Sequence, residues 1–326
     1  MMALRYLLGA ALLIQPLAHA RAEAQWATAR MPQALERDIV STNTGQRYRI
    51  FVSVPESAPP PGGHPVIYAL DGNASFPALA LMARTVERRS KVTGQAPPAV
   101  VGIGYASGED YDQAARALDY TPPAPALPGA PGRPGAADAG KEGGAARFLD
   151  FINLELKPLV QQLAPLDQQR QALFGHSYGG LFVLHTLFTQ PASFQTYIAA
   201  SPSIWWRERY VLTGLAGLAQ RSGGKPQLLI TVGELEQAAL PRASGAPAAG
   251  SAANAATERN KALMERRMVG EARQLAAALQ AAQPAQPGQP GQPRALSRVR
   301  FIELPGENHG SAMFPALSRG LEFFLE

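Results

Sequence analysis

The residues best suited to carry out chemistry form the sequence Gly175-His176-Ser177-Tyr178-Gly179-Gly180. An apolar run before it is expected to be a buried strand, and the residues after it begin a helical pattern. A serine in a Gly-x-Ser-x-Gly turn between a strand and a helix takes a strained backbone conformation that lifts its hydroxyl above the sheet. A side chain at either flanking glycine, Gly175 or Gly179, is expected to collide with the neighbouring strand or helix. We therefore interpret Ser177 as a candidate nucleophile.

A serine hydroxyl attacks at neutral pH only when a base accepts its proton, and histidine is the usual base. Of the five histidines, His309 follows the last expected strand, where the order serine, acid, histidine places the base. The other four lie in the amino-terminal apolar segment, in a loop ahead of a strand, within the serine turn, and two turns along the following helix. His309 is therefore the expected base, and an exposed loop histidine is the alternative.

The acid that would orient His309 must be a glutamate, because no aspartate follows Asp167. An expected strand ends at Gly233, and Glu234 and Glu236 come directly after it, in the loop where this arrangement carries its acid. The spacing favours Glu236. Glu234, or no acid at all, remains the alternative.

Attack on an ester carbonyl also needs two N–H donors for the developing oxyanion. The residue after the nucleophile, Tyr178, supplies one. The loop Asp71-Gly72-Asn73, which ends an apolar strand, is expected to supply the other from the Asn73 N–H. The alternative is an ordinary turn at the end of a strand.

Strands and helices that alternate along the chain are expected to position these groups. The pattern predicts an α/β-hydrolase fold: a doubly wound, mostly parallel sheet preceded by an amino-terminal antiparallel hairpin around Asn43-Thr44-Gly45. Expected parallel strands are Val66–Leu70, Ala99–Gly104, Gln171–Phe174, Thr196–Ala200, Gln227–Val232 and Arg298–Leu304. Expected helices include Pro77–Arg89, one from Ala145, one from Thr257 to Ala282, and Ser311–Leu325.

Composition and local sequence patterns indicate the location of the protein, its domain organisation and the partners it lacks. Residues 1–22 have a basic start, a short apolar stretch and small-x-small cleavage sites, so they are expected to be a signal peptide, with an uncleaved anchor as the alternative. Residues 23–326 are expected to form a single domain with low-complexity insertions near 122–144, 238–256 and 283–294. With no later membrane span and no cysteine, a periplasmic or secreted protein is expected. The net charge of +5 includes no lysine or arginine run, which argues against nucleic-acid binding.

Several motifs together resemble the putative-esterase family of α/β-hydrolases, and within it the exported esterases that open the siderophore trilactones enterobactin, salmochelin and bacillibactin. The resemblance covers most of the chain from about Thr42. It implies that Ser177 is the nucleophile and His309 the base, and it places Arg116 and Trp205-Trp206 near the substrate. The alternatives are that Arg116 pairs with Asp119 at the surface and that the two indoles cap the core. The motifs are Tyr68–Asn73, Val101–Tyr105, Arg116–Pro122, Gly175–Gly180, Ser201–Trp206 and Gly233–Glu236.

The expected function is hydrolysis of a small-molecule carboxylic ester, of the siderophore trilactone type, through an acyl-enzyme, with no metal or organic cofactor. The alternatives within enzymes are a general or feruloyl-type esterase and an acyltransferase. A further alternative is a non-catalytic protein that binds ferric siderophores.

Overall fold

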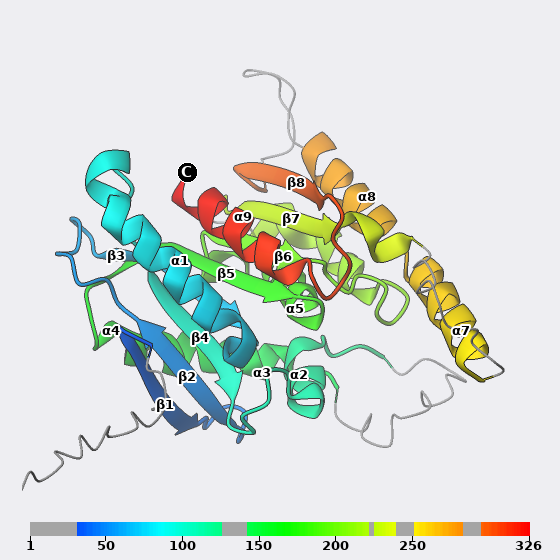
Figure 1. The fold of residues 1–326 in the computed structure, drawn as a ribbon, viewed down its shortest axis with the longest axis horizontal. Helices are drawn as coiled ribbons and strands as arrows, with labels where there is room; N and C mark the ends of the chain where they lie inside the picture. Colours follow the sequence, from blue (N-terminus) through cyan, green and yellow to red (C-terminus); the bar gives the residue numbers. More distant parts are fainter. Residues whose placement is uncertain (1–30, 126–141, 222–224, 239–250, 283–294) are drawn as a thin grey trace, which may run out of the picture. The chain divides into compact units, whose positions relative to one another are not determined.

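A mixed sheet forms the centre of the computed structural model (Figure 1). Its eight strands among the described residues have the order β1-β2-β4-β3-β5-β6-β7-β8. The strands β1 and β2 form an antiparallel hairpin, β2 pairs antiparallel with β4, and all later pairs are parallel. The strands are β1 Ala34–Val40, β2 Arg47–Ser53, β3 His64–Leu70, β4 Ala99–Tyr105, β5 Leu166–His176, β6 Thr196–Ala200, β7 Gln227–Gly233 and β8 Arg298–Leu304.

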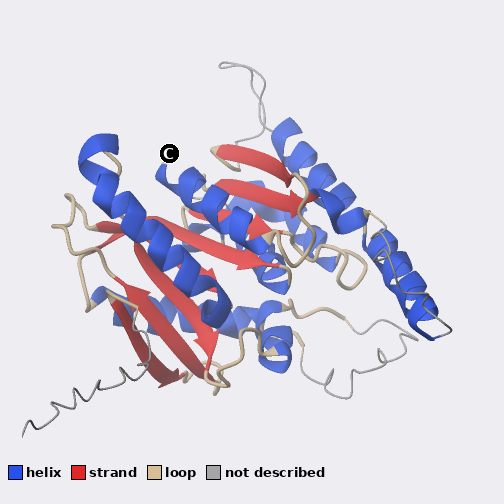
Figure 2. Cartoon of the chain, in the orientation of Figure 1, coloured by secondary structure: helices blue, strands red, loops and turns tan. Residues whose placement is uncertain are grey.

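Helices cover both faces of this sheet (Figure 2). The figures show α1 (Gly72–Thr93) and α9 (Met313–Leu325) across one face, with α3 (Ala145–Asp150) and α5 (Tyr178–Thr189) behind the other. The central strands β3 and β4 are buried at every position. Parallel strands with helices on both faces read as continuous apolar runs, which is why these segments were recognisable in the sequence. The α/β fold and the amino-terminal hairpin are as predicted.

The remaining described helices are mostly short. They are α2 Gln113–Tyr120, α4 Lys157–Gln161, α6 Leu218–Arg221, α7 Ser251–Arg266 and α8 Met268–Ala281. A π-helical segment, Phe151–Leu156, joins α3 to α4, and 3-10 segments cover Pro191–Ser193, Tyr210–Gly217 and Glu234–Gln237.

Two expected helices differ from those observed. The helix α1 begins at Gly72 rather than Pro77 and contains Pro77 as its sixth residue, where proline leaves out one intrahelical hydrogen bond. The helix expected from Thr257 to Ala282 is two helices, α7 and α8, separated at Arg267, whose φ of 50° lies outside the helical region.

The structure describes residues 31–125, 142–221, 225–238, 251–282 and 295–326. Gln33–Glu326 make one unit, and the other, Met1–Pro32, lies almost wholly outside the described residues. The predicted signal peptide, most of the insertions near 122–144 and 238–256, and all of residues 283–294 therefore fall outside the description. Within the described residues, no helix has both the length and the apolar character that crossing a bilayer requires.

Candidate active site

Ser177 lies at the junction of β5 and α5 in a strained conformation. Its φ of 60° and ψ of −115° fall outside the regions that L-residues favour. A Cβ at Gly175 would come 2.3 Å from the carbonyl oxygen of Gly179, so the expected collision holds there. It does not hold at Gly179, where the nearest atom would be at an ordinary 3.5 Å. The second crowded position is Gly180 instead, where a Cβ would lie 2.8 Å from the Ala200 carbonyl oxygen.

Three side chains from distant parts of the chain meet at this turn. Ser177 Oγ lies 3.0 Å from His309 Nε2, and His309 Nδ1 lies 2.6 Å from Glu236 Oε2. His309 follows β8 and Glu236 follows β7, so each group stands at the carboxyl end of a strand. Ser177, His309 and Glu236, which the sequence suggested as nucleophile, base and favoured acid, are thus joined in one hydrogen-bonded line.

Glu236 is held on its other oxygen as well. Its Oε1 accepts hydrogen bonds from Ser201 Oγ at 2.5 Å and from the Gly233 backbone N–H at 2.7 Å, and the residue is 1% exposed. Three donors to one buried carboxylate fix its position and offset the loss of hydration. Glu234 instead accepts from the Gly306 backbone N–H, on the exposed side of the loop.

His176, next to the nucleophile, packs against the candidate base. The two imidazole rings lie 4.8 Å apart between centroids with a 37° tilt. Burial, with smaller contributions from His309 and Arg116, lowers the pKa of His176 to about 3. The His176 ring is therefore neutral at neutral pH and adds no second positive charge when His309 accepts a proton.

The expected oxyanion donors lie at the starts of two helices. Tyr178 is the first residue of α5, and Asn73 is the second residue of α1, and backbone N–H groups at the start of a helix point out of its amino-terminal end. The Asn73 side chain exchanges two hydrogen bonds with the backbone of Tyr105, which fixes the loop after β3. The two loops adjoin, because a Cβ at Gly179 would lie 3.7 Å from Asp71 Oδ2. The roles of the two N–H groups stay predictions.

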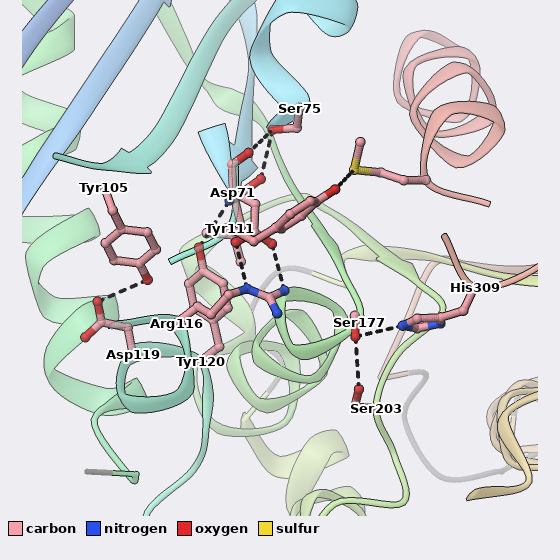
Figure 3. A network of polar contacts seen from close by, with 12 residues as sticks. Asp71, Ser75, Tyr105, Tyr111, Arg116, Asp119, Tyr120, Ser177, Ser203 and His309 are labelled. Atoms are coloured by element: carbon pink, nitrogen blue, oxygen red, sulfur yellow. Dashed lines mark hydrogen bonds and ion pairs between the residues drawn. The ribbon is translucent and has the colours of Figure 1, made fainter. Parts of the chain in front are cut away.

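Arg116 belongs to a buried network beside this loop (Figure 3). Its guanidinium donates twice to the Asp71 carboxylate, each at 2.9 Å, and the residue is 7% exposed. The alternative of a surface pair with Asp119 is wrong. Asp119 instead accepts from the hydroxyls of Tyr48 and Tyr105, and the helix α2 that carries Arg116 and Asp119 was not predicted. Arg116 thus braces the loop after β3 through Asp71.

The two tryptophans have different surroundings. Trp206 is 3% exposed within the hydrophobic core, and its Nε1 donates to Glu142. Its indole is thus part of the core, and its expected place near the substrate stays a prediction. Trp205 is only partly buried, with its ring 6.3 Å from that of Tyr178 and the Arg266 guanidinium 4.6 Å above it. Trp205 thus lies against the residue that follows the candidate nucleophile, and its contact with substrate also stays a prediction.

Sequence reasoning did not single out Ser201 and Ser203, on the segment after β6. Ser201 donates to Glu236, and Ser203 Oγ lies 3.4 Å from Ser177 Oγ. The available signal was the position of Ser201-Pro202-Ser203 at the carboxyl end of the strand next to β5. In the described part of the chain, no cluster of His, Cys, Asp and Glu has the arrangement of a metal site.

Comparison with known proteins identifies the family. Residues 41–273 match the family described as putative esterase. The chain belongs to the putative-esterase family. An ester hydrolase with an α/β-hydrolase fold, as expected from the motifs, is thereby confirmed.

Members of the putative-esterase family that act on siderophores are similar to this chain. It is 40% identical over 210 residues to the ferri-bacillibactin esterase BesA of Bacillus subtilis. This match covers 64% of this chain and 72% of BesA. It is 34% identical over 301 residues to the siderophore triacetylfusarinine C esterase of Aspergillus fumigatus, covering 89% and 93% of the two chains. The crystal structure of the BES protein from Bacillus cereus superposes with a TM-score of 0.76 at 31% identity, covering 93% of this chain and 99% of that one.

Proposed function

We propose that this protein is a serine hydrolase that cleaves the ester bonds of siderophores through an acyl-enzyme on Ser177. The observation that carries the proposal is the hydrogen-bonded line from Ser177 through His309 to the buried Glu236. Nucleophile, base and orienting acid at these distances are the arrangement that activates a serine hydroxyl. The siderophore esterases among the relatives support the substrate class.

The chemistry follows from the positions of the protons. Glu236 holds the proton of His309 on Nδ1, which leaves Nε2 to accept the proton of Ser177 as Oγ attacks the ester carbonyl. The backbone N–H groups of Tyr178 and Asn73 then stabilise the oxyanion. His309 returns the proton to the departing alcohol oxygen. Water, activated by the same Nε2, hydrolyses the acyl-enzyme and releases the acid.

The surroundings of Ser177 support an aromatic or anionic acyl group. Trp205 lies beside Tyr178, and the Arg266 cation lies over the indole. A catecholate ring can stack on such a surface while the cation favours its negative charge. The expected place of Arg116 near the substrate has less support, because its guanidinium is already paired with Asp71.

The test is hydrolysis by the mature protein of p-nitrophenyl butyrate, a catecholate trilactone and triacetylfusarinine C, each siderophore with and without Fe³⁺. The proposal expects turnover of at least one siderophore at a higher kcat/KM than the butyrate, and none by Ser177→Ala. Preference for the butyrate would assign a general esterase, and ester exchange with an added alcohol would assign an acyltransferase. Binding of the ferric trilactone without turnover would assign a siderophore-binding protein.

We also propose that the protein acts after export, in the periplasm or outside the cell. The basic, apolar and small-residue pattern of residues 1–22 supports this. Amino-terminal sequencing of the protein from a periplasmic extract is expected to begin near residue 21 or 23, after one of the small-x-small sites. A chain that starts at Met1 in the cytoplasm would refute the export proposal.

A further inference from the structure

Ser203 places a second hydroxyl beside the candidate nucleophile. It follows β6, is 1% exposed, and its backbone N–H donates to the Ser177 carbonyl at 3.1 Å. Its Oγ lies 3.4 Å from Ser177 Oγ, and a dashed line marks this contact in Figure 3. Within the described ranges, Ser177 Oγ is the only hydrogen-bond partner of this hydroxyl. A buried hydroxyl whose single partner is the nucleophile calls for a functional explanation, since alanine would fit there without burying a polar group.

The direction of this hydrogen bond follows from the rest of the line. Glu236 accepts three hydrogen bonds, so His309 Nδ1 carries a proton and Nε2 is an acceptor. The Ser177 hydroxyl donates its only proton to the hydrogen bond with Nε2. Ser177 Oγ can then interact with Ser203 only as an acceptor, so the Ser203 hydroxyl is the donor.

We propose that Ser203 is a further catalytic residue, whose hydroxyl donates to Ser177 Oγ and stabilises the negative charge that this oxygen carries during acylation and deacylation. This inference rests on the proposed serine mechanism. Ser203 differs from the two backbone oxyanion donors, because those act on the carbonyl oxygen of the substrate.

The proton and electron pairs balance without any change at Ser203. In acylation the Ser177 O–H bond breaks, its proton passes to His309 Nε2, and Oγ forms a bond to the acyl carbon as the alcohol leaves with that proton. In deacylation water adds to the acyl carbon and gives a proton to Nε2, the Oγ–carbon bond breaks, and Oγ takes the proton back. Ser203 keeps its own proton throughout.

The hydrogen bond is expected to be stronger in the transition states than in the ground states. The oxygen of a neutral hydroxyl or of an acyl ester is a weak hydrogen-bond acceptor. In the transition states, where the bond between Oγ and the acyl carbon forms or breaks, Oγ carries partial negative charge and is a strong acceptor. Only interactions that strengthen in this way raise the rate of the chemical steps. A long contact of 3.4 Å in the free protein is compatible with this role, because catalytic hydrogen bonds often tighten only on the reaction path.

The test compares Ser203→Ala with wild type, using the p-nitrophenol burst for acylation and the steady-state rate for deacylation of p-nitrophenyl butyrate. Both rates are expected to fall by about tenfold to a hundredfold with KM nearly unchanged. Ser203→Cys keeps the size of the side chain and a weak donor, so its two rates are expected to lie between those of wild type and Ser203→Ala. This variant also covers the case in which the alanine variant does not fold. Ser53→Ala is the matched control, because it removes another buried serine hydroxyl far from the candidate site. Ser53 lies on β2 and pairs with Val100 near the amino-terminal end of β4, whereas Ser203 follows the carboxyl end of β6.

Wild-type burst and steady-state rates in a folded Ser203→Ala protein would overturn the inference, and so would a loss confined to KM, which would make Ser203 a substrate contact. In either case an active wild type with an inert Ser177→Ala variant would leave the serine mechanism standing. An inert wild type would overturn the proposed function and this inference together.

Discussion

Replacing Glu236 by glutamine tests whether the buried acid sets the protonation of His309. The amide has one oxygen and one NH₂ group in place of two acceptors. Its oxygen is expected to take the place of Oε1, because Ser201 and the Gly233 N–H both donate there and an unpaired buried donor costs about 1–3 kcal/mol. The NH₂ group then faces His309 Nδ1, which must become an acceptor. The proton moves to Nε2, and the base can no longer accept from Ser177.

This wrong tautomer is expected to lower kcat by about 10⁴, the size of effect known when the acid of a Ser-His-Asp triad is changed to its amide. That factor corresponds to about 5.5 kcal/mol of transition-state stabilisation. The assay is steady-state hydrolysis of p-nitrophenyl butyrate, with circular dichroism to check the fold. Glu234→Gln is the matched control, since the Glu234 carboxylate accepts from the Gly306 N–H on the exposed side of the loop, and it is expected to stay within about threefold of wild type. A Glu236→Gln protein that retains more than a tenth of kcat would refute the reasoning and leave a serine–histidine dyad.

Three further changes test the structure around the site. Gly175→Ala is expected to lower the free energy of unfolding by about 3 kcal/mol, because its Cβ would lie 2.3 Å from the Gly179 carbonyl oxygen. Gly179→Ala is expected to lower it clearly less. Urea unfolding of the two variants measures the difference, and equal losses would contradict the packing. Burial raises the pKa of Asp119 to about 7, so the folded state binds this proton more tightly than the unfolded state, and stability falls as pH rises through about 7. Asp119→Asn is therefore expected to gain about 3 kcal/mol on wild type between about pH 5 and about pH 8, measured by urea unfolding at both values, and parallel pH profiles would contradict this. Arg116→Met leaves the Asp71 carboxylate buried without its partner and is expected to cost about 3–5 kcal/mol in thermal unfolding, with much of that loss recovered when Asp71→Asn is added; no recovery would contradict the pairing.

The sheet and the ends of its strands were predictable because local patterns determine them. Strands such as β3 and β4 are apolar at nearly every position, and the turn at Ser177 combines glycines with a strand on one side and a helix on the other. Parallel strands bring their carboxyl ends to one edge, so groups that follow β5, β7 and β8 were expected near one another. That is why Glu236 and His309 could be named beside Ser177.

The parts that were missed depend on long-range packing. The eight-residue helix α2 carries little periodic signal, and its Arg116 and Asp119 are buried only because Asp71 and two tyrosine hydroxyls meet them there. An arginine near an aspartate in sequence suggests an exposed ion pair, and nothing local shows that both lie in the interior. For the same reason Ser203 could not be singled out, because its role depends on a strand neighbour 26 residues away in sequence.

The most direct test of the central claim is to find which atom becomes covalently modified. The mature protein is incubated with diisopropyl fluorophosphate, its esterase activity is followed, and the adduct is located by peptide mass mapping. The account predicts one phosphoryl adduct per chain, on Ser177, formed in proportion to the loss of activity, and none on Ser177→Ala. Ester hydrolysis that persists in Ser177→Ala, or an inactivating adduct on another residue, would contradict it.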